Sequence, residues 1–231
     1  MTVGPAAGRD GSHRTGLAVV ATTREVLDRP ELHEGLLAPW ERRRLAATRL
    51  PGRRDDVLAA RLLVRLCVAG FTGLPWTEAA PAQLCPGCGR HGHGRPYLPG
   101  HPGVGVSLSH ADGLVAAAVG PGAVGIDVEP SARRPGPLRA LRRLLPETDL
   151  RDAAAQPDPG PALLRLWVRR EAELKAGGAG LTGQDGLGPL TGGACLPGRA
   201  GLGLLVWTDD DRAAVAAVAS EAPTTVRSLW S

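Results

Sequence analysis

The sequence is short of three residue types. Its 231 residues include 27 basic ones, yet Lys175 is the single lysine, Ile126 is the single isoleucine, and asparagine is absent. This shortage is typical of a high-GC genome, in which codons for these residues are scarce. Because the chain uses arginine wherever arginine can serve, Lys175 either marks a position that needs a compact, flexible ammonium group or survives by chance.

Long apolar segments are also missing. No stretch of about 18 apolar residues occurs, which predicts that the chain has no membrane span. Residues 1–16 lack the apolar core of a secretory signal, and we expect them to form a disordered tail. Without a signal, the four cysteines favour reduced thiols and a cytoplasmic location over a disulfide framework. The net charge of +4 favours an acidic partner or a phosphate-rich ligand.

Aromatic residues are few, which argues against nucleic-acid binding. Five tryptophans, one tyrosine and one phenylalanine are scattered along the chain rather than arrayed as a surface on which bases stack. One segment supports the alternative, because Cys85, Cys88, His91 and His93 are zinc-ligand types and a zinc knuckle occurs in small nucleic-acid-binding modules. The two histidines are closer together than in the usual zinc-finger spacing, so zinc binding is the less favoured interpretation.

The apolar patterns predict a mixed fold of helices and strands. Three short strands over residues 104–109, 114–119 and 124–129 are separated by Asp-Gly and Pro-Gly turns, which predicts an antiparallel meander. Residues 72–102 are rich in glycine and proline and predict a loop. The remaining elements are an N-terminal strand, three helical segments and a closing hairpin, expected at residues 17–22, 40–45, 55–68, 163–176 and 201–219.

Two acidic residues mark the third of these strands. Asp127 and Glu129 are two positions apart, so they point to the same face of a strand. Paired carboxylates repel each other unless water or a cation lies between them, and hard oxygen ligands of this kind suit Mg²⁺. A solvated strand end is the simpler interpretation of this pair taken alone.

The helix expected at residues 163–176 carries a second pair. Leu164, Val168, Glu171 and Lys175 are spaced by four, three and four residues and lie on one stripe, so two charges continue an apolar stripe. An ordinary salt bridge on a solvated face is the alternative. Ser109 and His110, at the end of a strand, could hold a phosphate or simply cap a turn, and no Gly-x-Ser-x-Gly elbow supports a hydrolase.

Together these segments are more specific than any one alone. In chain order they are Gly94–Pro96, Ser107–His110, Val124–Glu129 and Trp167–Leu181. Their order and spacing resemble the surfactin-type 4′-phosphopantetheinyl transferases, from about Arg53 to Leu181. The resemblance implies an enzyme that moves 4′-phosphopantetheine from coenzyme A to a serine of an apo carrier protein, with Mg²⁺, and releases 3′,5′-ADP.

The resemblance also implies a role for each matching residue. Asp127, Glu129 and Glu171 would bind Mg²⁺, and Glu171, Lys175 and His110 would be catalytic. Coenzyme A phosphates would contact Ser109, His110, Lys175, Arg95 and either Arg53 or Arg54. One position departs from the family motif, because Arg170 replaces a lysine and stays protonated. The base that accepts the serine proton is then Glu171 or a metal-bound hydroxide.

The implied fold is α+β (α/β), with two similar subdomains forming a pseudo-dimer within one chain, at residues 17–122 and 123–231, and we expect a monomer. Acyl or peptidyl carrier proteins of polyketide or nonribosomal peptide biosynthesis would be the partners. Because carrier proteins are acidic, an arginine-rich segment would dock them, through Arg133, Arg134, Arg139, Arg142 and Arg143. A solvated loop is the alternative interpretation of this segment. An inactive carrier-binding protein of the same fold is the alternative function.

Overall fold

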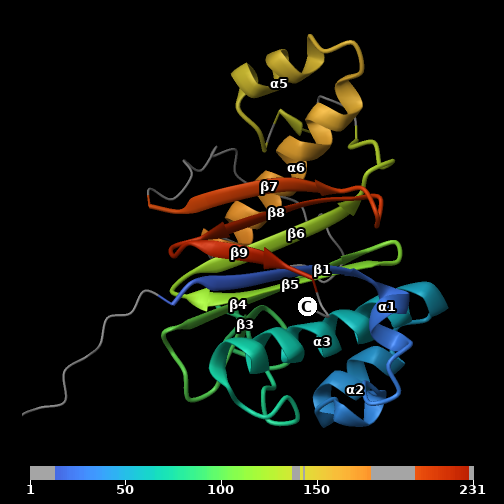
Figure 1. Cartoon of the computed structure of the whole chain (residues 1–231), viewed down its shortest axis with the longest axis vertical. Coiled ribbons are helices and arrows are strands. Elements are labelled where there is room, and N and C mark those ends of the chain that lie inside the picture. Colours follow the sequence, from blue (N-terminus) through green and yellow to red (C-terminus); the bar gives the residue numbers. More distant parts are fainter. Residues whose placement is uncertain (1–13, 137–140, 143, 178–200, 229–231) are drawn as a thin grey trace, which may run out of the picture.

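The computed structural model describes residues 14–136, 141–142, 144–177 and 201–228. Figure 1 shows four stacked layers, in which each of two sheets is covered on its outer face by one long helix. The mixed α+β class predicted from the sequence is confirmed. The helices are α1 (Thr23–Leu27), α2 (Pro39–Ala46), α3 (Pro51–Thr72), α5 (Glu147–Ala154) and α6 (Pro159–Gly177), with a short 3-10 turn at Glu34–Leu36.

The first sheet has the strand order β4-β5-β1-β9. The second has the order β6-β8-β7, and β2 and β3 form a separate hairpin. The strands are β1 (Gly16–Thr22), β2 (Ala82–Leu84), β3 (Arg95–Tyr97), β4 (Val104–Ala111), β5 (Leu114–Pro121), β6 (Val124–Pro130), β7 (Gly203–Asp209), β8 (Ala214–Ser220) and β9 (Thr224–Arg227).

Strands β5 and β8 are apolar on both faces, which explains why the two sheets stack on each other. In β5, Val115, Ala117 and Val119 pack under α3, while the alternate residues 114, 116 and 118 face the second sheet. Strand β8 repeats this pattern between the first sheet and α6. A strand buried on both faces reads as a continuous apolar run, and small alanine side chains let the layers approach closely.

The predicted meander is wrong at its third strand. Strands β4 and β5 pair antiparallel as expected, but β6 pairs antiparallel with β8, with Val124 opposite Ser220. Its apolar residues pack against the first sheet, so the Pro121-Gly122 turn passes the chain from one sheet to the other instead of extending the first. The loop predicted at residues 72–102 contains the β2–β3 hairpin, and α5 and β9 had no sequence signal.

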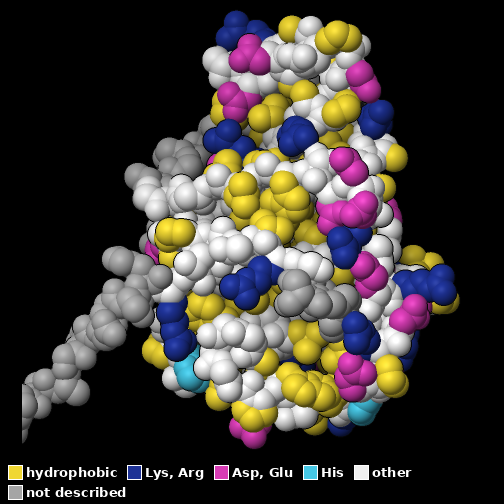
Figure 2. All heavy atoms as spheres, viewed as in Figure 1, with side chains coloured by type: hydrophobic (Ala, Val, Ile, Leu, Met, Phe, Trp, Pro, Cys, Tyr) yellow, Lys and Arg dark blue, Asp and Glu magenta, His cyan; other side chains and the backbone are white. Residues whose placement is uncertain are grey.

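Two surface features complete the fold. Figure 2 shows apolar side chains at the level of β7, where Leu204 and Leu205 are exposed. Arginine and acidic side chains are interspersed around the end of the molecule that carries α5. Among the described helices, none combines the length and the hydropathy that crossing a bilayer requires.

Candidate functional site

The two predicted motifs meet where β6 packs on α6. Val124, Ile126 and Val128 face the core between the sheets, so Asp127 and Glu129 project to the opposite face, towards α6. The close approach depends on Gly125, because a Cβ atom there would lie 2.1 Å from the carbonyl oxygen of Ala172. The small residue therefore brings the acidic strand against the helix that carries Glu171 and Lys175.

Lys175 is the centre of the hydrogen-bond network. Its ammonium group lies 2.6 Å from Oδ1 of Asp127 and 3.0 Å from Oγ of Ser109, and it also donates to the carbonyl oxygen of Ile126 at 3.0 Å. Ser109 itself donates to Oδ1 of Asp127 at 2.7 Å. The single lysine of the chain thus joins α6 to β6 and to β4.

Edge strands of the two sheets adjoin at this point. Oγ of Ser107, on β4, accepts a hydrogen bond of 3.1 Å from the backbone N–H of Ile126, on β6. A Cβ atom at Gly105 would lie 2.0 Å from the carbonyl oxygen of Gly122, so the two backbones run in close contact. The network around Lys175 therefore lies at the junction of the two sheets.

The carboxylates are buried and incompletely paired. Asp127 is 5% exposed, and its Oδ2 atom has no hydrogen-bond partner. Burial and the neighbouring Asp127 charge raise the pKa of Glu129 to about 7, although Arg133 and Trp167 bond to it. Burial and Asp127 likewise raise the pKa of Glu171, opposed by Lys175 and Arg170. Crowded, desolvated carboxylates of this kind favour a bound cation.

These donors fit Mg²⁺ in chemistry, because they are hard oxygen ligands and one of them is unpartnered. Among the described residues the three carboxylates do not lie within 4.8 Å of one another as a group. Instead Asp127 pairs with Lys175, and Glu129 pairs with Arg133 at 2.6 Å. Holding an ion would therefore require both ion pairs to rearrange.

His110 lies on the other face of β4. It shares that face with Val106 and Leu108, which pack with the core beneath α3. Burial lowers the pKa of His110 below its ordinary value, and the charges of Lys175, Arg53 and Arg61 act in the same direction, against Asp56. The imidazole thus lies near the Asp56 carboxylate and three cations, and its lowered pKa favours the neutral form, which can donate a hydrogen bond to a phosphate.

The two arginines left open by the sequence separate in the structure. Arg53 is close enough for its charge to act on His110. Arg54 instead forms an ion pair of 2.5 Å with Glu34. Arg95, at the start of β3, donates to the carbonyl oxygen of Ala176 at 2.6 Å, which ties the β2–β3 hairpin to the end of α6.

Two residues that sequence reasoning missed support this region. Asp56 is 7% exposed and accepts hydrogen bonds from the Thr23 hydroxyl and from the backbone N–H of Gly113, in the turn just after β4. Arg61 is buried against Glu41, which also pairs with Arg65. The sequence signal for these was only a charge within the apolar face of a helix.

The proposed docking arginines are mostly paired. Arg133 bonds to Glu129, Arg134 lies 3.5 Å from Asp158, and Arg142 lies 3.6 Å from Glu147. Arg139 and Arg143 lie outside the described residues, as does the 178–181 end of the helix motif. In the described part, Arg170 is 12% exposed at its side chain and lies 3.6 Å from Glu173.

Similarity to known proteins is found in the part of the chain that contains β6 and α6. Residues 123–195 match the model of the 4′-phosphopantetheinyl transferase superfamily. The chain is 29% identical, over 127 residues, to a 4′-phosphopantetheinyl transferase of Bacillus subtilis. That match covers 54% of this chain and 53% of the relative, so the chain spans about half the length of the curated relative it matches. The resemblance predicted from the motifs is thereby confirmed: the chain is similar to the 4′-phosphopantetheinyl transferases.

Proposed function

We propose that this chain transfers 4′-phosphopantetheine from coenzyme A to a serine of an apo carrier protein, releasing 3′,5′-ADP, in the manner of the surfactin-type enzymes. One observation carries the proposal. Lys175, within the region that matches the superfamily, lies between Asp127 and Ser109 at the junction of the two sheets. Carboxylates, an ammonium group and a hydroxyl converge there, as phosphoryl transfer requires for positioning and charge stabilisation.

Mg²⁺ would be held by Asp127, Glu129 and Glu171. The ion would supply charge neutralisation for the coenzyme A pyrophosphate. Support comes from the unpartnered Oδ2 atom of Asp127 and from the raised pKa values of Glu129 and Glu171, which burial and Asp127 cause. Lys175, which contacts Asp127 in this structure, would bind a phosphate oxygen of coenzyme A.

Basic and polar residues would bind the coenzyme A phosphates. Ser109 and His110 project from opposite faces of β4, and Arg53 lies near His110. Arg95 lies against the end of α6. We choose Arg53 over Arg54 because the charge of Arg53 acts on His110.

The serine hydroxyl of the carrier must lose a proton during the attack. Arg170 stays protonated and cannot accept it. Glu171 follows it on the same helix, and in the metal-free chain burial, with Asp127, raises the pKa of its carboxyl group; the carboxylate oxygen that Mg²⁺ leaves free would accept the proton. We therefore place proton acceptance on Glu171.

The remaining features of the proposal concern the whole chain. It would act as a cytoplasmic monomer of two subdomains, residues 17–122 and 123–231, on carriers of polyketide or nonribosomal peptide biosynthesis. One long helix over each sheet supports this division, although β9 joins the first sheet. The carrier would dock on the segment that holds Arg133, Arg134, Arg139, Arg142 and Arg143.

Mass spectrometry tests the transfer directly. An apo carrier protein incubated with the chain, coenzyme A and Mg²⁺ should gain the mass of one phosphopantetheine. Asp127→Ala should abolish the gain, whereas Asp28→Ala, an exposed aspartate paired with Arg24, should not. Absence of transfer to carriers of several classes would refute the proposal and favour an inactive carrier-binding protein.

Carrier docking has a separate test. Neutralising Arg139, Arg142 and Arg143 together should raise the KM for the carrier at low salt and leave the KM for coenzyme A unchanged. An unchanged carrier KM would refute docking on this segment without affecting the transfer reaction.

A further inference from the structure

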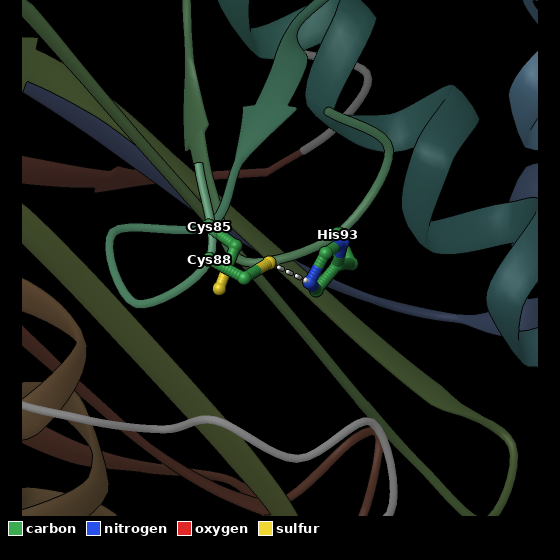
Figure 3. A group of neighbouring side chains, drawn as sticks. All are labelled: Cys85, Cys88 and His93. Carbon is green, nitrogen blue, oxygen red and sulfur yellow. Dashed lines mark hydrogen bonds between the residues drawn. The ribbon is translucent and has the colours of Figure 1, made fainter. Parts of the chain in front are cut away.

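A second group of metal-ligand side chains lies in the β2–β3 hairpin. The ligand atoms of Cys85, Cys88 and His93 all lie within 4.8 Å of one another. Figure 3 shows the Cys88 sulfur facing the His93 imidazole, with Cys85 beside Cys88. The distance from Sγ of Cys88 to Nε2 of His93 is 3.2 Å. Tetrahedral zinc, with bonds of about 2.3 Å to sulfur and 2.0–2.1 Å to nitrogen, needs ligand atoms about 3.5–3.8 Å apart.

The backbone of the hairpin is built to bring these side chains together. The backbone N–H of Cys85 donates to the carbonyl oxygen of Arg90 at 3.0 Å, and that of Gly89 donates to the carbonyl oxygen of Cys85 at 2.8 Å. Gly94 has a φ of 83°, and a Cβ atom there would lie 2.5 Å from Cα of Cys85. Only glycine permits this approach, which places His93 next to the cysteines.

The environment of Cys85 favours the thiolate, the form that binds metal. The backbone N–H groups of Cys88 and then Gly87 donate to its sulfur, and Arg90 lies nearby; hydrogen-bond donors and a cation of this kind stabilise a thiolate. A pair of cysteines separated by two residues could instead form a redox-active disulfide. The imidazole of His93 favours a metal site over a disulfide, because it places a third ligand atom within 4.8 Å of both sulfur atoms, which a disulfide does not require.

The hairpin is connected to the candidate active site. The side chain of Gln83, at its base, donates to the carbonyl oxygen of Gly94 at 3.1 Å and accepts a hydrogen bond from Arg61 of α3 at 3.4 Å. On the other strand, Arg95 donates to the carbonyl oxygen of Ala176 in α6. A metal that fixes the loop between Cys85 and His93 would therefore also fix Arg95.

We propose that Cys85, Cys88 and His93 bind one Zn²⁺ ion that holds the β2–β3 hairpin in place. Two thiolates and an imidazole are soft and borderline ligands that select zinc over Mg²⁺. The three protein ligands leave the fourth tetrahedral position to water. The role is structural, and zinc binding itself does not depend on whether the chain carries out the transfer proposed above.

Metal analysis of the full chain, purified without a histidine tag, tests the site. We expect about one zinc per chain, and on exchange with Co²⁺ the visible absorption of a tetrahedral thiolate site. Cys88→Ser and His93→Gln should each weaken zinc binding more than about tenfold. His91→Gln is the matched control, because His91 lies two residues from His93 but outside the group, and it should bind zinc as the unaltered chain does.

Three results would overturn the proposal. They are a chain that takes up no zinc or Co²⁺ under reducing conditions, equal loss of zinc in His91→Gln and His93→Gln, and a Cys85–Cys88 disulfide that forms in the presence of zinc. Cys88 is exposed, so Cys88→Ser should fold, and the Co²⁺ spectrum of the unaltered chain needs no variant. None of these measurements uses coenzyme A or a carrier, so failure of the zinc site and failure of the transfer reaction remain distinguishable.

Discussion

Replacing Glu129 with glutamine should stabilise the metal-free protein at neutral and alkaline pH. Burial, with Asp127, raises the pKa of this carboxyl group from its ordinary 4.5 to about 7. Between these two pH values the folded chain binds a proton that the unfolded chain has released. The free energy of unfolding therefore falls as pH rises through this window, and the stability contributed by Glu129 is complete only below pH 4.5.

The size of the effect follows from the pKa. Each pKa unit corresponds to about 1.4 kcal/mol, so the ionised Glu129 costs the folded state at most about 3 kcal/mol above pH 7. The pKa of about 7 already includes the ion pair with the half-exposed Arg133, so Glu129→Gln removes this whole cost and no separate loss is subtracted. The gain should be about 2–3 kcal/mol at pH 8 and should vanish near pH 4.5.

Urea unfolding with a metal chelator, from pH 4.5 to pH 8, measures this difference. The quantity to compare is the stability of Glu129→Gln minus that of the unaltered chain, since other groups titrate in both. Glu78→Gln, at an exposed glutamate, should give a difference near zero throughout. If the stability difference between Glu129→Gln and the unaltered chain does not change with pH, the raised pKa of Glu129 is refuted. Added Mg²⁺ should stabilise the unaltered chain more than the variant.

Three further predictions concern neighbouring positions. Gly125→Ala should separate β6 from α6 and lower the free energy of unfolding by about 1–3 kcal/mol. Gly52→Ala, where a Cβ atom meets nothing within 4 Å, should raise the free energy of unfolding. Equal urea midpoints for the two variants would contradict the close contact between β6 and α6. Because burial lowers the pKa of His110, the unfolded chain binds its proton first, so stability should fall as pH drops below 6.5, and His110→Gln should remove that decline in urea unfolding. A double-mutant cycle of Lys175→Met and Asp127→Asn should give a coupling of about 0.5–3 kcal/mol, and a coupling of zero would show that their 2.6 Å contact adds no stability.

Local sequence patterns predicted the orientation of side chains at the candidate site better than the pairing of its strands. The period of two in β6 and the spacing of residues along α6 correctly indicated that Asp127 and Glu129 share one face and that Lys175 points inward. These periods follow from backbone geometry alone, so they need no knowledge of the partner element.

Strand pairing depends on information that local patterns do not contain. The Pro-Gly turn at residues 121–122 is compatible with a hairpin, yet β6 pairs with β8, which lies almost ninety residues further along the chain. The network of Asp56 with Thr23 and Gly113 likewise joins three distant segments. Strands β5 and β8 carry apolar residues on both faces, so the sequence of each strand does not indicate which element it pairs with. The partners are selected when the two sheets pack together.

The pairing of β9 has a consequence for how the chain is made. Strand β1 lies between β5 and β9, and its backbone pairs in parallel with residues 224–227, more than two hundred positions later. Until residues 224–227 leave the ribosome, one side of β1 stays an open edge, and an open edge can pair with other chains. Synthesis therefore passes through a stage in which β1 and β5 exist while the other edge of β1 is still unprotected, and removing residues 224–227 would make that stage permanent.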